Sequence, residues 1–322
     1  MANRLATVFG GAGFIGRHVV QRLAADGWRV RVAGRDAEAA AFLMPRGDVG
    51  QVIPVYADVT KEFSVTAAVQ GADLVINLVG ILFERGKQTF QAIHVDGAAR
   101  IATAAKAAGA AALVHVSALG ADAASPSAYA RSKAAGEAAV RAAFPDAAIL
   151  RPSVVFGPED DFFNRFARMA GWTPVLPVYV TDGFTCRRRT AEKDLCPVFG
   201  SGGTKFQPLY VGDLINAIAA AAAPPNAGRT FELGGPKVYN LKQILELILS
   251  ATGKRRALLP LPLVIAKIQA AFLQFLPKPP LTPDQVKMLA ADNVVAPGMP
   301  GLAELGIVPT AVELILPTYL SR

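Results

Sequence analysis

The fold follows from one short segment, which reads Leu5-Ala-Thr-Val-Phe-Gly-Gly-Ala-Gly-Phe-Ile-Gly16. A strand-like run leads directly into a glycine-rich turn, and a helical pattern follows over residues 14–26. In such a turn Gly10 permits the tight bend, Gly13 lets backbone amides approach a pyrophosphate, and Gly16 lets the helix pack closely on the sheet. The N-terminus of the helix attracts anions. We therefore expect a nucleotide-binding turn here rather than a purely structural one.

The same alternation continues along the first half of the chain. Short runs rich in Val, Ile and Leu occur at residues 29–33, 51–56, 74–77, 112–117 and 147–150, and helical patterns occur at 61–70, 89–108 and 127–144. Near-continuous apolar strands separated by amphipathic helices are typical of a parallel sheet that is covered on both faces. Right-handed crossovers then give a doubly wound α/β (Rossmann) fold, which we expect over residues 1–151.

The character of the chain changes after Arg151. Prolines become frequent, and helical patterns recur at residues 211–223, 240–252 and 282–291, with a short strand pattern at 230–233. We expect residues 152–322 to form a smaller, helix-rich lobe over the carboxyl ends of the strands, where ligands bind in sheets of this kind.

Composition excludes several classes of protein. The 322 residues are 52% hydrophobic and 18% charged, with a net charge of +8, 3 His and 2 Cys. The His and Cys residues have no metal-ligand spacing, so no zinc or haem site is expected, and two cysteines indicate a reducing compartment. Basic residues do not cluster with aromatic ones as in nucleic-acid-binding proteins. No uninterrupted apolar run of about 18 residues is present that could span a bilayer.

The residue that follows the second strand pattern indicates the cofactor. NAD sites place Asp or Glu there to hydrogen-bond the ribose diol, whereas this chain has Arg35. A guanidinium can pair with a 2′-phosphate and stack on adenine, and Arg17 could supply a second cation. The carboxylate of Asp36 is either the ribose acid displaced by one residue or, as we favour, the cap of the next helix. The pattern therefore favours NADPH over NAD(H).

Two further strand ends are expected to line the nucleotide. Asp58 and Val59 follow the third strand, where the aspartate would either meet the adenine edge or stabilise a turn. The residues after Asn77 follow the fourth strand, where the backbone would pass close to the cofactor ribose. The residues expected from these patterns to bind the cofactor are Gly10, Gly13, Phe14, Ile15, Gly16, Arg17, Arg35, Asp58, Val59, Leu78, Val79 and Gly80.

Three candidate catalytic residues follow the fifth strand pattern. Tyr129 and Lys133 are four residues apart, on one face of a helix, and Ser117 ends the strand. A nearby ammonium lowers the pKa of a phenol from its usual ~10, and Lys133 could also hold the ribose hydroxyls. Taken singly, each residue has an ordinary structural interpretation: a half-buried tyrosine, a solvated lysine and a serine that caps a strand end. Because all three occur together with a glycine motif, we interpret them first as residues that bind the cofactor. Catalytic turnover would be a further function of the same residues.

These motifs resemble those of the extended, epimerase-like branch of the short-chain dehydrogenase/reductase superfamily over essentially the whole chain. The resemblance rests on the glycine turn, Asp58, Ser117, the Tyr129-x-x-x-Lys133 pair and residues 151–157, Arg-Pro-Ser-Val-Val-Phe-Gly. Within that branch the chain is most similar to the NADPH-binding accessory subunit of respiratory complex I, the alpha-subcomplex subunit 9 family. The narrower likeness rests on residues 129–137, 144–152, 157–164, 206–213, 281–289 and 292–295.

The resemblance implies a tightly bound NADPH with a structural role, and it adds Pro152 and Val154 to the cofactor site. It implies a place beside complex I peripheral-arm subunits near the quinone site, peripheral to the membrane on its cytoplasmic side, or the matrix side in a mitochondrion. It also implies an accessory role rather than an independent enzyme, with Ser117, Tyr129 and Lys133 as vestigial catalytic residues. Because Tyr129 and Lys133 are both present, their loss cannot be cited against activity.

Two segments of the second lobe are candidates for contact with partners. The stretch 178–198 is longer than in relatives and carries Cys186, Arg187, Arg188, Arg189 and Cys196. One interpretation of this stretch is a solvated surface loop. The more specific interpretation is a basic segment that contacts an acidic partner or phospholipid head groups. The two cysteines read as free thiols. The proline-bounded run 263–276 is almost wholly apolar, so its helix must be buried in its own lobe, in a partner or at a lipid interface.

Two functions of different classes are compatible with this sequence. The first is an accessory, NADPH-holding subunit of complex I. The second is a free NAD(P)-dependent oxidoreductase or epimerase that acts on a carbonyl or sugar-nucleotide substrate through Tyr129 and Lys133. A soluble nucleotide-sensing regulator is a third and weaker alternative. The family-like segments and the apolar helix favour the first.

Overall fold

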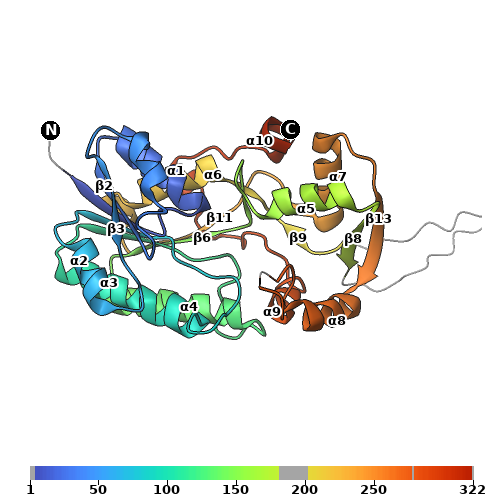
Figure 1. Ribbon diagram of the computed structural model, residues 1–322, viewed down its shortest axis with the longest axis horizontal. Helices are drawn as coiled ribbons and strands as arrows, with labels where there is room; N and C mark the ends of the chain where they lie inside the picture. The colour runs from blue at the N-terminus through green and yellow to red at the C-terminus, as the bar shows by residue number, and fades with distance from the viewer. Residues whose placement is uncertain (1–3, 181–201, 278, 321–322) are drawn as a thin grey trace, which may run out of the picture. The chain divides into compact units, whose positions relative to one another are not determined.

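The computed structural model describes residues 4–180, 202–277 and 279–320 (Figure 1). The chain divides into two compact units. The first comprises Met1–Pro152, Val211–Leu233 and Ala296–Val308, and the second comprises Ser153–Tyr210, Gly234–Val295 and Pro309–Arg322. Residues 211–233 and 296–308, which the sequence analysis assigned to the second lobe, thus lie in the first unit. Residues 181–198 of the expected insertion, with both cysteines and the three arginines, fall outside the described residues.

A seven-stranded parallel sheet forms the centre of the first unit. Its strand order is β11-β6-β5-β4-β1-β2-β3, which confirms the doubly wound topology. The strands are β1 (Leu5–Phe9), β2 (Arg29–Gly34), β3 (Val52–Tyr56), β4 (Leu74–Asn77), β5 (Ala112–Val116), β6 (Ala148–Pro152) and β11 (Thr230–Leu233). Phe9 lies opposite both Ala33 and Asn77, and Asn77 lies opposite His115, so the carboxyl ends of four strands meet at one edge.

Strand β11 joins this sheet because β6 would otherwise be an exposed apolar edge. Its residues pair in register from Thr230 opposite Ile149 to Leu233 opposite Pro152. Ile149 and Leu150 are fully buried, and an uncovered edge of that kind is open to pairing with other chains. The segment after residue 295 then follows β11, whose Glu232 amide donates to the Pro300 carbonyl at 2.9 Å.

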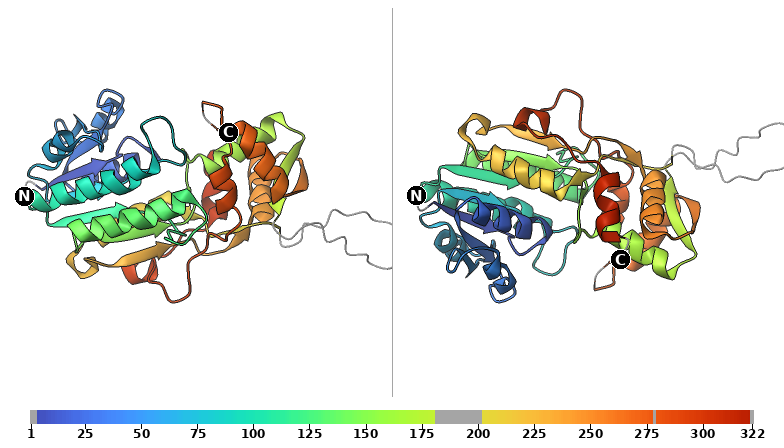
Figure 2. Two further views of the ribbon diagram at one scale, coloured as in Figure 1. Left: turned by 90° about the horizontal axis from the view of Figure 1, so that it is seen from below. Right: turned by 90° about the horizontal axis from the view of Figure 1, so that it is seen from above.

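Helices cover both faces of the sheet (Figures 1 and 2). The helices α1 (Phe14–Ala25) and α6 (Val211–Ala221) contact each other on one face. The other face carries α2 (Glu62–Val69), α3 (Gly97–Ala107) and α4 (Ala128–Ala143). Four short helical turns, η1 (Ala41–Arg46), η2 (Gln91–Asp96), η3 (Pro224–Asn226) and η4 (Ala303–Leu305), complete the unit.

The single helix expected over 89–108 is divided into a π turn, η2, and α3. The cause is a close crossing by α4, where a Cβ on Gly136 would lie 2.2 Å from the His94 carbonyl oxygen. Because α4 packs directly on this backbone, the turn departs from regular α-helix, as π turns commonly do at functional sites.

The second unit consists of helices around short strand pairs. The helices are α5 (Phe162–Trp172), α7 (Leu241–Thr252), α8 (Leu263–Leu273), α9 (Pro283–Met288) and α10 (Val312–Leu320). The strands are β7 (Val155–Phe156), β8 (Val175–Val180), β9 (Lys205–Phe206), β10 (Leu209–Tyr210), β12 (Tyr239–Asn240) and β13 (Ala257–Pro262). The parallel β8–β13 pair was not expected from the sequence. Its prolines are tolerated because each strand of a two-stranded sheet has one unpaired edge.

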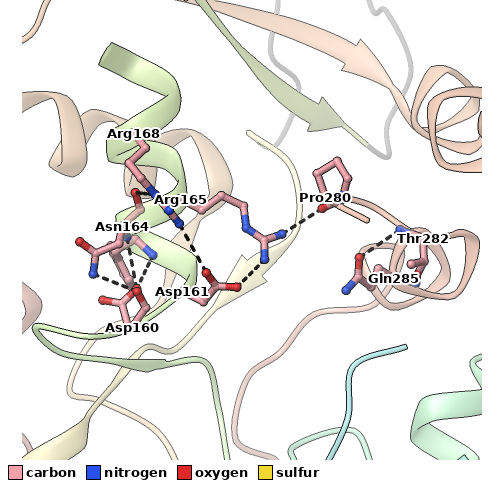
Figure 3. Close-up of polar contacts among 9 residues, drawn as sticks. Asp160, Asp161, Asn164, Arg165, Arg168, Pro280, Thr282 and Gln285 are labelled. Atoms are coloured by element: carbon pink, nitrogen blue, oxygen red, sulfur yellow. Dashed lines mark hydrogen bonds and ion pairs between the residues drawn. The ribbon is translucent and has the colours of Figure 1, made fainter. Parts of the chain in front are cut away.

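Polar contacts fix the start of α5 (Figure 3). The Asp160 carboxylate accepts hydrogen bonds from the amides of Phe163 at 2.6 Å and Asn164 at 3.3 Å, and from the Tyr319 hydroxyl at 2.7 Å. Burial raises the pKa of Asp160 in spite of these donors. Asp160 thus ties α5 to α10.

A second group of contacts positions the chain between α8 and α9 (Figure 3). The Arg165 guanidinium donates to the Pro280 carbonyl at 2.9 Å and to Asp161 at 2.5 Å. Thr282 and Gln285 form a capping box that starts α9.

Among the helices of the described residues, none is long and apolar enough to cross a membrane.

Candidate nucleotide site

The glycine turn between β1 and α1 has the geometry that a pyrophosphate requires. Gly10 has a φ of +77°, and a Cβ on Gly16 would lie 2.3 Å from the Gly10 carbonyl oxygen and 2.5 Å from the Gly11 Cα. Only glycine fits at Gly16. No side chain caps α1 at Gly13, so its first amides, at Phe14 and Ile15, remain available to an anion.

The carboxyl end of β2 presents a cation. Arg35 follows Gly34 directly and is exposed. The Asp36 carboxylate accepts a hydrogen bond from the Ala39 amide at 2.8 Å and so stabilises the turn that precedes η1. The expectation that Asp36 caps the next helix is wrong, because η1 has Ala40 as its N-cap and no side-chain cap. The Arg17 guanidinium lies 5.3 Å from the centre of the Phe42 ring, and its Nε donates to the Gly13 carbonyl at 3.4 Å.

Asp58 and Val59, which follow β3 after Ala57, differ in their roles. Asp58 accepts hydrogen bonds from the amide and hydroxyl of Thr60 at 2.9 and 2.7 Å. Burial would raise the pKa of Asp58, but these bonds and the charges of Lys61 and Arg35 together lower it. The side chain of Val59 is buried against α3. Asp58 therefore lies close enough to Arg35 for the positive charge to lower its pKa. The side chain of Val59 instead belongs to the hydrophobic core.

The chain after β4 passes directly over the glycine turn. A Cβ on Gly10 would lie 3.3 Å from the Leu78 carbonyl carbon and 3.4 Å from the Val79 amide nitrogen. A Cβ on Gly80 would lie 3.7 Å from the Lys133 Nζ. The segment 78–80 thus lies between the glycine turn and the Lys133 ammonium of α4.

The candidate catalytic residues lie where β5 ends. Lys133 is buried, its Nζ donates to the Val116 carbonyl at 3.2 Å, and burial lowers its pKa to about 8 against the opposing charge of Glu137. The Ser117 hydroxyl is buried and has no hydrogen-bond partner among the described residues. Burial raises the pKa of Tyr129 to about 12. The expected lowering of this pKa by Lys133 is thus wrong for the chain by itself, because desolvation of the phenol raises the pKa instead.

Two buried histidines also belong to this site, and sequence reasoning missed them. The His94 Nε2 accepts from the Ile81 amide at 3.0 Å, so its proton lies on Nδ1, which is 2.8 Å from the Ser132 hydroxyl. Ser132 in turn donates to the Tyr129 carbonyl at 2.7 Å. Burial, with the charge of Lys133, lowers the pKa of His94 to about 3, so it is neutral.

The second histidine, His115, is held in the same neutral state at the neighbouring strand end. The Asn77 side-chain oxygen accepts from the Val79 amide at 3.0 Å, so its nitrogen donates to the His115 Nδ1 at 3.1 Å. Burial, with the charge of Lys133, lowers the pKa of His115 to about 3. A histidine within an otherwise apolar strand was the signal that could have identified it.

These residues fit a dinucleotide. The glycine turn closes so tightly on the start of α1 that a Cβ on Gly16 would collide with its backbone. The Ser117 hydroxyl is buried without a partner among the described residues, and Lys133 places an ammonium beside Gly80. No group of three His, Cys, Asp or Glu that could hold a metal ion occurs in the described part of the chain.

The two remaining expected cofactor residues, Pro152 and Val154, lie in different units. Pro152 ends β6, and its carbonyl accepts a hydrogen bond from the Leu119 amide at 3.0 Å. Val154 belongs to the second unit.

Comparisons with known proteins match this geometry. The model of the NAD dependent epimerase/dehydratase family matches residues 6–241. The mitochondrial NADH dehydrogenase [ubiquinone] 1 alpha subcomplex subunit 9 of Rattus norvegicus is 37% identical over 313 residues, which are 96% of this chain and 78% of that protein. The chain belongs to the epimerase/dehydratase family and to its alpha subcomplex subunit 9 branch.

Two further proteins of other kinds are similar to this chain. A ceramide reductase of Caulobacter vibrioides is 39% identical over 177 residues, or 55% of this chain and 54% of that protein. A dTDP-glucose 4,6-dehydratase of Bacillus anthracis, solved in complex with NAD, has a TM-score of 0.69 at 15% identity and covers 98% of this chain and 95% of that chain. The latter likeness shows the epimerase/dehydratase fold alone.

Proposed function

We propose that this chain is an NADPH-holding accessory subunit of respiratory complex I. The observation that carries the proposal is the similarity to alpha subcomplex subunit 9, which extends over nearly the whole chain. The proposed place is peripheral to the membrane on its cytoplasmic or matrix side, beside peripheral-arm subunits near the quinone site.

Arg35 supports NADPH over NADH as the resident nucleotide. It is the exposed cation at the end of β2, while the neighbouring Asp36 carboxylate is engaged with the Ala39 amide. A guanidinium pairs well with a 2′-phosphate. The amides of the glycine turn would bind the pyrophosphate, and Lys133 and Ser117 would bind the ribose and nicotinamide end. NADPH supplies a transferable hydride when bound, and the neutral His94 and His115 beside Lys133 add no competing positive charge.

Arg35→Asp should weaken NADPH binding more than NADH binding, by about 1–3 kcal/mol for a lost charge-assisted contact. Isothermal calorimetry with both nucleotides measures this difference. Arg29→Asp is the matched control, because Arg29 begins β2 at the opposite end of the strand and the charge change is identical. Equal affinity of the unmodified chain for NADPH and NADH would contradict the assignment.

Purification from the native membrane tests the accessory role. The chain should co-purify with detergent-solubilised complex I and release NADPH on denaturation, identified by chromatography. A native chain found only in fractions that lack complex I would overturn the proposed partnership.

The ceramide reductase relative favours a second candidate, a free NADPH-dependent reductase of a carbonyl substrate. Ser117 would hold the oxygen of the substrate carbonyl. Tyr129 would donate a proton to that oxygen, so that with a hydride from the bound nucleotide the C=O double bond becomes the C–OH of an alcohol. The T-shaped contact of Tyr129 with His94, at 5.5 Å between ring centres, would hold the phenol in place.

Tyr129→Phe separates the two functions. In a free reductase, loss of the proton donor should lower turnover by roughly 10²–10⁴-fold while nucleotide affinity stays within about twofold. In an accessory subunit, the same change should leave the quinone reductase activity of complex I nearly unaltered. Steady-state assays of both activities, with calorimetry as the binding control, distinguish these outcomes. A large loss of quinone reduction with normal assembly would contradict the accessory role.

A further inference from the structure

The outer face of α8 is a large exposed apolar surface in the second unit. Val264 is 63% exposed, Ile268 56% and Phe272 75%, and Phe275, just beyond the helix, is 82% exposed. These residues follow one another at helical spacing and so share one face. Ile265 and Leu276 widen the same face. We call these six residues the α8 face.

Burial within its own unit does not account for the α8 face. The helix rests on two small residues, Ala266 and Ala270, which pack with Val286 of α9. On that inner side the Gln269 side chain accepts a hydrogen bond from the Tyr179 hydroxyl at 2.8 Å. The large apolar side chains therefore point away from the described core of the unit, which a water-exposed helix would not sustain.

The charge of α8 favours a lipid occupant. The helix contains no Asp or Glu, and its one charged residue is Lys267. Lys267 is exposed. An exposed apolar face with aromatic residues, on a helix that carries a cation and no acid, is the pattern of a helix that lies in a negatively charged membrane interface.

We infer that the α8 face lies in the interfacial layer of an anionic bilayer. The 11 residues of α8 give a length of roughly 16 Å, too short to cross a membrane, so the helix lies in the plane of the surface. The ammonium of Lys267, exposed on the same helix, attracts the lipid phosphates. The inference goes beyond the proposed complex I partnership, because it concerns direct contact with lipid.

Co-sedimentation of the full-length chain with vesicles tests the inference. Binding to vesicles of phosphatidylcholine with phosphatidylglycerol should exceed binding to phosphatidylcholine alone, and added salt should weaken it. Phe272→Glu should lower binding to the anionic vesicles by at least about tenfold, because it removes an inserted ring and adds a repelled charge. Phe63→Glu is the matched control, since Phe63 is an equally exposed phenylalanine, at 70%, on α2 of the first unit.

Point substitution is preferable to deletion of the segment. Deleting residues 260–280 would remove half of β13, whose Pro260, Leu261 and Pro262 pair with β8. Lys267→Glu provides a second variant that keeps the apolar face. It should weaken binding to anionic vesicles several-fold and leave binding to neutral ones unchanged.

Four results would overturn the inference. These are no binding to anionic vesicles, equal effects of Phe272→Glu and Phe63→Glu, a concentration-dependent dimer that Phe272→Glu dissociates in ultracentrifugation, and loss of the Phe272→Glu chain from detergent-solubilised complex I. The third would assign the α8 face to a second copy, and the fourth to a protein partner. Failure of vesicle binding leaves co-purification of the unmodified chain with complex I untouched, so the two proposals fail separately.

Discussion

Replacing Arg151 with methionine is expected to lower the free energy of unfolding by about 3–5 kcal/mol, because it leaves two buried carboxylates without a counter-ion. The Arg151 guanidinium lies 2.7 Å from Glu137 on α4 and 3.3 Å from Glu232 on β11. Glu137 and Glu232 are 6% and 8% exposed. Urea denaturation followed by circular dichroism measures the change.

An exposed ion pair provides the control for Arg151→Met. Arg22→Met removes a contact of 2.8 Å with Asp26 on the surface of α1, which should cost less than about 1 kcal/mol. Acidification should reduce the difference in unfolding free energy between Arg151→Met and the unmodified chain, since protonation of the two glutamates removes their unpaired negative charge. Equal costs for the two arginines, or a gap that widens at low pH, would contradict this role for Arg151.

Gly16→Ala is expected to weaken NADPH binding by at least about a hundredfold, equivalent to roughly 2.7 kcal/mol. The new methyl group would lie 2.3 Å from the Gly10 carbonyl oxygen and 2.7 Å from the Gly11 carbonyl carbon. Both neighbours are backbone, so the turn itself would have to move and its amides would lose the phosphate. Calorimetry with NADPH measures the loss.

The same substitution at Gly171 tests whether the effect belongs to the turn. Gly171 lies in α5, where a Cβ would meet only the mobile ammonium of Lys254 at 3.3 Å. Gly171→Ala should leave NADPH affinity unchanged and raise stability by up to about 1 kcal/mol through helix propensity. Similar affinity losses for both variants would show that the glycine turn has no special role.

The sheet and its covering helices could be predicted because their signals are local. The runs at Leu74–Asn77 and Ala112–Val116 are apolar except for one residue each, Asn77 and His115, and the strand at each position is observed. The β8–β13 pair could not be predicted in this way. Pro177, Pro260 and Pro262 mask its strand character, and its pairing depends on residues about 80 apart in the chain.

Prediction of the site had a similar limit. The glycine turn, Arg35 and the Tyr129–Lys133 pair were found because each has a characteristic spacing. The pKa of Tyr129 depends on burial by residues such as Phe90 and His94, which contact its ring from another segment. Likewise, the role of Arg151 depends on Glu137 and Glu232, which only the folded sheet brings together.

The division of the chain into two units has a consequence for how it is made. The chain passes between the units after Pro152, Tyr210, Leu233, Val295 and Val308. A nascent chain of 151 residues, although it contains the whole glycine motif and the Tyr129–Lys133 pair, lacks the edge strand β11 and the buried partner Glu232. The sheet can be completed only after residue 233 has left the ribosome, and the first unit only after residue 308. Both units should therefore acquire protease resistance together, late in synthesis, instead of one after the other.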